Sequence, residues 1–273
     1  MSVRARWSSL VVAVVTALAL VGAVPARAGA RTAEPDWSRP GPHEVAVEVL
    51  PAHTLFYPKH PGPGRRPVIL WGNGTAAIPL FYVSLLRHWA GHGFVVAAAN
   101  TPMSGTGREM LAGLDVLAAR DAGTGPLGGR IDLRRVATSG HSQGGAGAIN
   151  AAADPRVATA VPIQPGGRAD GARLRGPALF LAGEKDSIVT PAEVRRYFDA
   201  AGQVPAIYAE LRGADHFTPL ADGGGYRGPT TAWLRATLLG DARARALFFG
   251  PGCGYCGDPR WSAFVRNAGA GGA

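Results

Sequence analysis

The 273 residues are 47% hydrophobic and 17% charged, which excludes an intrinsically disordered body and lets the chain bury one substantial core or at most two small ones. Its 39 glycines and 22 prolines predict many turns but fall short of a collagen-like or low-complexity composition. The formal net charge of +9 is the excess of 26 arginines and two lysines over 19 acidic residues. Because they are scattered rather than gathered in a basic stripe, we expect no nucleic-acid partner.

Residues 1–28 have the three-part layout of a secretory signal peptide. Two arginines precede an apolar run over residues 10–24, and residues 26–28 read Ala-Arg-Ala, an A-x-A cleavage site. A retained membrane anchor is the alternative, but the run is shorter than the about 20 apolar residues that a membrane span needs. We predict cleavage after Ala28 and a secreted protein without an integral membrane segment. Three arginines and no acidic residue then leave, so the mature net charge is +6.

A Pro-rich lead over residues 29–42 precedes the region that we expect to fold, residues 43–250. Residues 43–50 alternate apolar and polar side chains as in a half-buried strand, and residues 54–57 read as its hairpin partner. From there, short continuous apolar runs alternate with helix-length segments. The predicted strands are 68–71, 94–99, 136–138, 157–163, 178–181 and 206–211, and the predicted helices are 80–90, 108–120, 143–153, 192–201 and 230–239.

Strands without polar alternation, separated by helices, are typical of a parallel sheet that is covered on both faces. The sequence therefore predicts one α/β domain: a mostly parallel central sheet, helices on both faces and an antiparallel N-terminal lead-in. No internal repeat and no linker divides it. Open sheets of this kind place their sites at the carboxyl ends of the strands, so the residues that directly follow each strand are the candidates for chemistry.

Both cysteines lie in the C-terminal tail, residues 251–273, at positions Cys253 and Cys256. Outside the cytosol this pair is expected to form a local disulfide. A redox-active C-x-x-C pair belongs at a helix N-terminus in a βαβ unit, and a zinc site needs two further ligands nearby. Neither context is present, so we predict a structural disulfide and no metal.

Residues 140–144, Gly-His-Ser-Gln-Gly, match the motif G-x-S-x-G. In so glycine-rich a chain the bare match is weak. Its context is specific, because a predicted strand runs straight into the motif and a helix of small residues leaves it. A nucleophile elbow has this layout, with glycines where larger side chains would clash around a strained serine. We predict that Ser142 is a nucleophile, next to a helix N-terminus that stabilises negative charge.

A serine nucleophile needs a base, and the base must be held by an acid. His216 is the histidine in the loop after the last predicted strand, and Asp186 follows the strand before it. Glu184 is the rival acid. His88 and His92 fall on or just after the first predicted helix, where we expect solvated side chains. The alternative is that Asp186 only caps the next helix and His216 sits in an ordinary polar turn. The order Ser, Asp, His at successive strand ends favours an α/β-hydrolase.

The stretch after the first parallel strand supplies further candidates. We expect the backbone N–H groups of Gly74 and Gln143 to form an oxyanion hole. Residues 72–77 also match a dinucleotide fingerprint, but no acidic residue ends the next strand to hold a ribose, so we expect no nucleotide cofactor. We expect three aromatic side chains to line an acyl pocket, and core packing is the alternative role for them. These are Trp71, Phe81 and Phe217.

Ser142 in its elbow, Asp186, His216 and the stretch over residues 67–96 resemble the secreted bacterial α/β-hydrolases related to cutinases, polyester hydrolases and dienelactone hydrolases. The resemblance covers residues 43–240. It implies a serine esterase that cleaves carboxylic esters, small or at a polymer surface, without a metal or organic cofactor. We expect a monomer. In this group the serine attacks the acyl carbon, the histidine shuttles the proton, the aspartate orients the imidazole, and water releases the acyl-enzyme.

Three departures from the resemblance bear on the substrate. Polyester hydrolases of this kind usually have an aromatic residue at the position of Gly74, a methionine at that of Gln143, and a tryptophan where this chain has residues 164–167. Polyester cleavage is therefore left open. Two other functions also stay open at this point: a catalytically silent binding protein with the same fold, and a serine peptidase with the same three residues.

Overall fold

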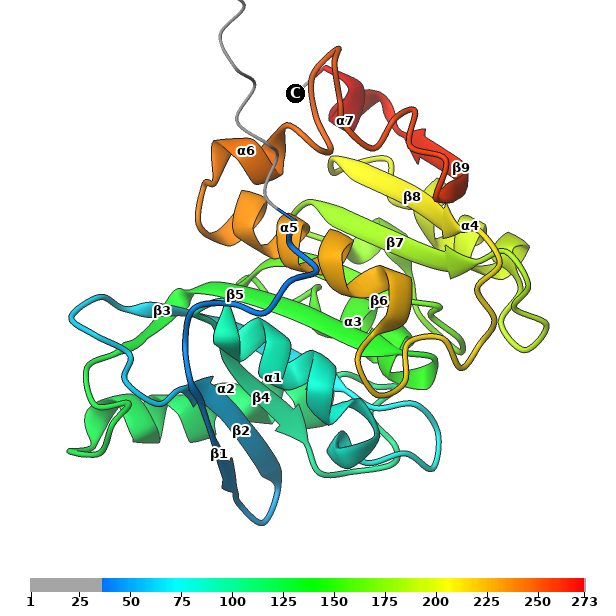
Figure 1. The fold of residues 1–273 in the computed structure, drawn as a ribbon. Coiled ribbons are helices and arrows are strands. Elements are labelled where there is room, and N and C mark those ends of the chain that lie inside the picture. Colours follow the sequence, from blue (N-terminus) through cyan, green and yellow to red (C-terminus); the bar gives the residue numbers. More distant parts are fainter. Residues whose placement is uncertain (1–35, 273) are drawn as a thin grey trace, which may run out of the picture. The chain divides into compact units, whose positions relative to one another are not determined.

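A nine-stranded sheet runs through the protein, whose computed structural model describes residues 36–272 (Figure 1). The strand order is β1-β2-β4-β3-β5-β6-β7-β8-β9. Neighbours from β4 to β8 pair in parallel, whereas β1–β2, β2–β4 and β8–β9 pair antiparallel. The strands are β1 (Val45–Val49), β2 (His53–Pro58), β3 (Arg66–Gly72), β4 (Val95–Ala99), β5 (Ile131–His141), β6 (Val157–Ile163), β7 (Ala178–Gly183), β8 (Ala206–Leu211) and β9 (Trp261–Arg266).

Helices cover both faces of this sheet, with α1 and α5 on one face and α2, α3 and α4 on the other (Figure 1). The predicted mostly parallel α/β sheet with an antiparallel lead-in is confirmed. None of the helices within residues 36–272 is long and apolar enough to cross a bilayer. The helices are α1 (Val83–Gly91), α2 (Arg108–Ala122), α3 (Gln143–Ala151), α4 (Pro191–Asp199), α5 (Arg227–Leu238), α6 (Ala242–Arg245) and α7 (Ala268–Gly271), with 3-10 turns η1 (Pro79–Tyr82), η2 (Gly171–Arg173) and η3 (Gly224–Tyr226).

Trp71 belongs to the core and not to an acyl pocket, so that expectation is wrong. Successive side chains of β3 point to opposite faces, which places Leu70 in one hydrophobic cluster and Trp71 in the other. Trp71 is fully buried, with its ring centroid 5.6 Å from that of Trp89 on α1. Its indole Nε1 donates to Asn73 Oδ1 at 3.0 Å, so the buried polar atom is satisfied.

The C-terminal segment is part of the sheet, although we placed the end of the domain at residue 250. Strand β9 pairs antiparallel with β8, from Leu211–Trp261 to Ile207–Arg266. It is an edge strand whose side chains are mostly half-buried, so its sequence lacks the apolar run that marked the inner strands. The predicted Cys253–Cys256 disulfide is confirmed just ahead of this strand.

Two histidines expected at the solvent are instead packed against the N-terminal lead. His92 is buried and His88 is partly buried, and their rings lie 4.6 Å apart. Each Nε2 is 3.0 Å from a backbone carbonyl oxygen, of Trp37 for His88 and of Arg39 for His92, so each ring donates there. Burial lowers the pKa of His88 to about 4. Trp37 and Arg39 therefore cover the end of α1, and burial keeps both rings neutral near pH 7.

We expect the protein to lose stability as the pH falls from about 6.5 towards 4. In the fold, burial lowers the pKa of His88 to about 4 and that of His141 to about 3, from an ordinary value of 6.5. The unfolded chain takes up these protons at a higher pH than the folded chain. The contribution of each neutral ring to the free energy of unfolding is therefore largest above pH 6.5 and decreases below it. Urea unfolding between about pH 7.5 and about pH 4.5 measures the decline.

The matched variant is His88→Gln, which keeps an N–H donor for the Trp37 carbonyl but does not titrate. Its free energy of unfolding should fall less steeply with decreasing pH than that of the wild type. Equal slopes for the two proteins would contradict the assignment to His88.

Candidate active site

Ser142 stands in the sharp turn between β5 and α3. Its φ of 56° and ψ of −122° are values that residues with a side chain rarely adopt. A Cβ on Gly140 would lie 2.3 Å from the Gly144 carbonyl oxygen, and a Cβ on Gly144 would lie 2.1 Å from the Gly72 carbonyl oxygen. Both flanking positions therefore require glycine, and the structure contains the strand–turn–helix layout that the motif predicted.

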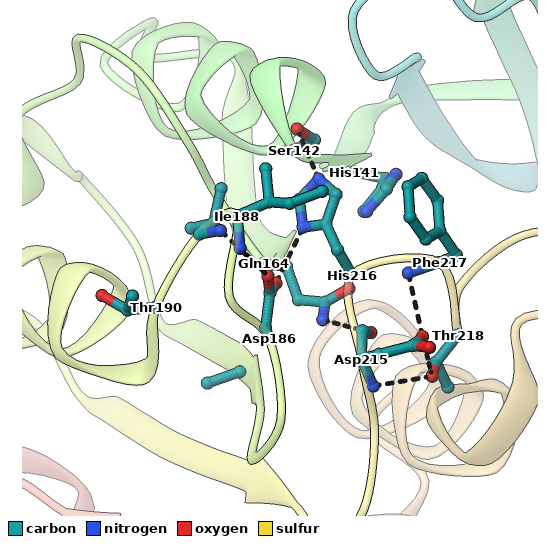
Figure 2. A network of polar contacts seen from close by, with 12 residues as sticks. His141, Ser142, Gln164, Asp186, Ile188, Thr190, Asp215, His216, Phe217 and Thr218 are labelled. Carbon is teal, nitrogen blue, oxygen red and sulfur yellow. Dashed lines mark hydrogen bonds and ion pairs between the residues drawn. The ribbon is translucent and has the colours of Figure 1, made fainter.

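His216 lies between Ser142 and Asp186, as Figure 2 shows. Its Nε2 is 3.0 Å from Ser142 Oγ and its Nδ1 is 2.7 Å from Asp186 Oδ2. The histidine and the aspartate are both buried. The structure thus brings together the three predicted residues from the ends of β5, β7 and β8. In this arrangement the imidazole can take a proton from the serine hydroxyl, while the carboxylate keeps the other ring proton on Nδ1.

The aspartate is fixed by the loop that follows β7. Asp186 Oδ1 accepts two backbone N–H groups, from Ile188 and Val189, at 2.9 Å each, which leaves Oδ2 for the imidazole. The rival acid Glu184 accepts the Gly213 N–H at 2.7 Å instead. Asp186 is therefore the carboxylate that contacts the histidine ring.

A buried glutamine that is not among the predicted site residues supports the histidine loop. Gln164 follows β6 and is fully buried, and its Nε2 donates to the Asp215 carbonyl oxygen at 2.7 Å (Figure 2). The Asp215 carboxylate closes a turn by accepting the Phe217 N–H at 3.0 Å and the Thr218 hydroxyl at 2.9 Å. Since Gln164 and Asp215 are 51 positions apart, no local pattern could have revealed the contact.

The two backbone N–H groups predicted as oxyanion donors differ in whether they already have a hydrogen-bond acceptor. Gln143 opens α3, and the first N–H groups of a helix have no intrahelical partner, so its N–H is placed for an external acceptor. The Gly74 N–H instead donates to the Tyr82 hydroxyl at 3.2 Å. A substrate oxygen would have to share or replace that acceptor. Gly74 therefore stays a prediction as an oxyanion donor.

The Tyr82 hydroxyl links Gly74 to His141, the residue before the serine. Its oxygen is 2.9 Å from His141 Nδ1. Burial and the neighbouring His216 lower the pKa of His141 to about 3, so the ring is neutral near pH 7. The Gln164 side chain and the His216 backbone act on this pKa in the opposite direction. His141 Nε2 and Gln164 Oε1 are both buried without a hydrogen-bond partner among the described residues. The tyrosine oxygen also accepts the Gly74 N–H, so Tyr82 connects the predicted oxyanion donor to the His141 ring.

Ser142 and His216 open into a cavity of about 350 Å³, which we call the serine cavity. Phe81 and Phe217 line it, with 52% and 60% of their surface exposed, and their contact with an acyl group stays a prediction. Within residues 36–272, no three His, Cys, Asp or Glu side chains are grouped so that they could hold a metal ion. Most of the remaining wall is apolar and comes from Ala76, Ala77, Ile188 and Leu220.

The Gln164→Leu variant should lower kcat by about 10- to 100-fold with little change in KM, because the His216 loop loses its buried support and the imidazole shifts from the serine. Ester hydrolysis kinetics together with thermal unfolding measure this. The matched control is Gln203→Leu, which removes an amide bonded to the Gly171 and Leu174 carbonyls elsewhere in the fold. It should cost stability only. Equal losses of kcat in both variants would show that Gln164 does not position the histidine.

Comparisons with known proteins agree with this geometry. A family model described as PET hydrolase-like matches residues 41–254, which include all the site residues above. Bis(hydroxyethyl) terephthalate hydrolase from Streptomyces coelicolor is 27% identical over 73% of this chain and 66% of its own length. Cutinase cut1 from Thermobifida fusca is 28% identical over 89% and 84% of the two chains, and cutinase 2 from Thermobifida cellulosilytica 30% identical over 75% and 80%. The resemblance to cutinases and polyester hydrolases is confirmed, and the chain belongs to the PET hydrolase-like family.

Proposed function

We propose that this protein is a serine esterase that hydrolyses carboxylic esters through Ser142, His216 and Asp186. Ester cleavage itself is the activity of its family and of its relatives named as a cutinase and a bis(hydroxyethyl) terephthalate hydrolase. The observation that carries the three residue roles is the continuous hydrogen-bonded path from the Ser142 hydroxyl through the His216 ring to the Asp186 carboxylate.

The proposed reaction follows from these distances. Ser142 Oγ attacks the acyl carbon while His216 Nε2, 3.0 Å away, accepts the hydroxyl proton. The Gln143 N–H, assisted by the Gly74 N–H, stabilises the negative oxygen of the tetrahedral intermediate. The imidazolium returns its proton to the departing alkoxide, which leaves an acyl-enzyme. A water molecule, deprotonated by the same ring, then releases the acid and restores the serine.

Asp186 acts on this reaction through the histidine. Its Oδ1 is held by two backbone N–H groups, so Oδ2 faces Nδ1 in one fixed direction. The negative charge stabilises the imidazolium that forms in each half of the reaction. Because the carboxylate is buried, the interaction is only weakly screened by water.

The serine cavity supports soluble esters with one small acyl group as substrates. Its volume of about 350 Å³ accommodates an aromatic or a short aliphatic acyl chain. Residues 164–167 stand where related polyester hydrolases have a tryptophan. At Gly166 there is no room for a larger side chain, because a Cβ would lie 2.5 Å from Val189 Cγ2. The exposed rings of Phe81 and Phe217 are the aromatic surfaces that remain to contact a substrate.

Export is also part of the proposal. The predicted signal peptide, residues 1–28, lies outside the described residues. The Cys253–Cys256 disulfide supports an oxidising compartment. Protein recovered from the medium or periplasm of an expressing bacterium should begin at Gly29 by N-terminal sequencing. A mature chain that still begins at residue 1 would contradict export by cleavage.

Replacing the three residues one at a time tests the proposed mechanism. Ser142→Ala should abolish labelling by a fluorophosphonate probe and lower kcat by about six orders of magnitude. Asp186→Asn should lower kcat by about four orders of magnitude, because the amide stabilises the wrong histidine tautomer. Hydrolysis of 4-nitrophenyl esters of increasing chain length measures both effects.

Glu184→Gln is the control for the acid, since it removes the rival carboxylate and should leave kcat close to that of the wild type. Labelling that survives in Ser142→Ala would exclude this serine as the nucleophile. A peptide amide hydrolysed faster than every ester would assign the site to a peptidase.

A further inference from the structure

Three arginines have no partner for their guanidinium groups within residues 36–272: Arg108, Arg168 and Arg173. Every other arginine in that range forms an ion pair, a hydrogen bond to a carbonyl oxygen, or a contact with an aromatic ring. Arg108 opens α2, Arg168 follows β6, and Arg173 lies in η2, so they come from three separate segments. The fold, and not a run in the sequence, gathers them.

All three line one cavity of about 710 Å³, which we call the arginine cavity. No aspartate or glutamate lines it. No ion pair joins the acidic neighbours in sequence to these arginines: Glu109 accepts the hydroxyl of Thr106, which itself lines the cavity, and Asp170 accepts the Ala172 N–H. Three positive groups that form no ion pair within residues 36–272, around a cavity that no acidic residue of that range lines, repel one another, and the cavity therefore favours an anion.

Gln143 separates the arginine cavity from the serine cavity. Its Nε2 is 3.4 Å from Thr75 Oγ1, on the wall of the serine cavity, and 3.3 Å from Met103 Sδ, on the wall of the arginine cavity. Its Oε1 accepts the Gly105 N–H at 3.2 Å. The residue that directly follows the nucleophile therefore has its side chain between the two cavities. A substrate that reached both the serine and the arginines would have to pass this side chain.

We propose that the arginine cavity binds a carboxylate of the ester substrate, so that the preferred substrates are half-esters of dicarboxylic acids. The inference rests on the proposed esterase function. Guanidinium groups bind carboxylates through paired, charge-assisted hydrogen bonds, whereas a neutral ester leaves the arginines unpaired. Hydrolysis of one ester bond of a diester produces such a half-ester. The protein is then suited to the second cleavage, which releases the free diacid.

Two esters of the same shape and different charge test the proposal. The 4-nitrophenyl ester of terephthalic acid keeps one free carboxylate, and in the matched ester that group is a neutral carboxamide. The wild type should prefer the anion by about tenfold or more in kcat/KM, mainly through KM. Adipic and suberic acid half-esters, with their monoamides, extend the comparison to flexible chains of different reach.

The variant Arg108→Gln/Arg168→Gln/Arg173→Gln should bring the ratio of anionic to neutral kcat/KM close to one, with turnover of the neutral ester unchanged. Since these side chains have no partners, its thermal unfolding midpoint should not fall. The control Arg39→Gln/Arg134→Gln/Arg243→Gln removes the same charge from side chains that are 82%, 90% and 68% exposed. It should keep the wild-type ratio.

An equal loss of the preference for the anionic ester in both triple variants would mean that the net positive charge of the protein attracts the anion at long range. That result would overturn the arginine cavity as a binding site. Absence of an anionic preference for all three acids, with the neutral esters still hydrolysed, would overturn this inference and leave the esterase proposal standing. Hydrolysis of none of the esters would overturn both.

Discussion

The close approach of α3 to the end of β3 is the constraint on which the site depends. Gly144 leaves no room for a Cβ beside the Gly72 carbonyl, and Gly147 leaves none beside the Ser104 carbonyl. This contact forces the chain through the strained turn at Ser142, because the helix has to begin immediately where β5 ends. It also brings the first N–H of α3 next to the loop that carries Gly74. The proposed nucleophile and the predicted oxyanion donors are thus positioned by the packing of backbone against backbone.

Four neighbouring strands then complete the catalytic side of the site. β5, β6, β7 and β8 run parallel in that order, so their carboxyl ends share one edge of the sheet. Ser142, Gln164, Asp186 and His216 follow them in turn. In the strand order, the glutamine at the end of β6 comes between Ser142 and its two partners, and its amide holds the backbone next to the histidine. Burial of this polar network requires that its groups bond one another, which fixes the imidazole between the hydroxyl and the carboxylate.

The proposed substrate recognition involves the positions at which this chain departs from the pattern expected of polyester hydrolases. With glycine at position 74, the space that a side chain would take is occupied by the Tyr82 hydroxyl, 3.0 Å from where a Cβ would lie. Glutamine at position 143 places a polar side chain between an apolar cavity that contains the serine and a basic cavity that contains three arginines. The turn that contains Ser142 and Gln143 therefore borders an apolar cavity on one side and a basic cavity on the other. An ester with one aromatic or aliphatic end and one anionic end matches both.

The sequence by itself determined the features that depend on neighbouring residues. Continuous apolar runs predicted the buried parallel strands, glycines around Ser142 predicted the elbow, and strand ends singled out Asp186 and His216. Tertiary structure decided which face of the sheet each buried side chain takes, and so placed Trp71 in the core. Both faces of an inner strand are apolar, so the sequence pattern does not tell the two faces apart. Tertiary structure also decided that β9 joins the sheet, that Gln164 supports His216, and that Arg108, Arg168 and Arg173 share a cavity. These contacts join residues far apart in the chain, and their energies come from packing that no local pattern encodes.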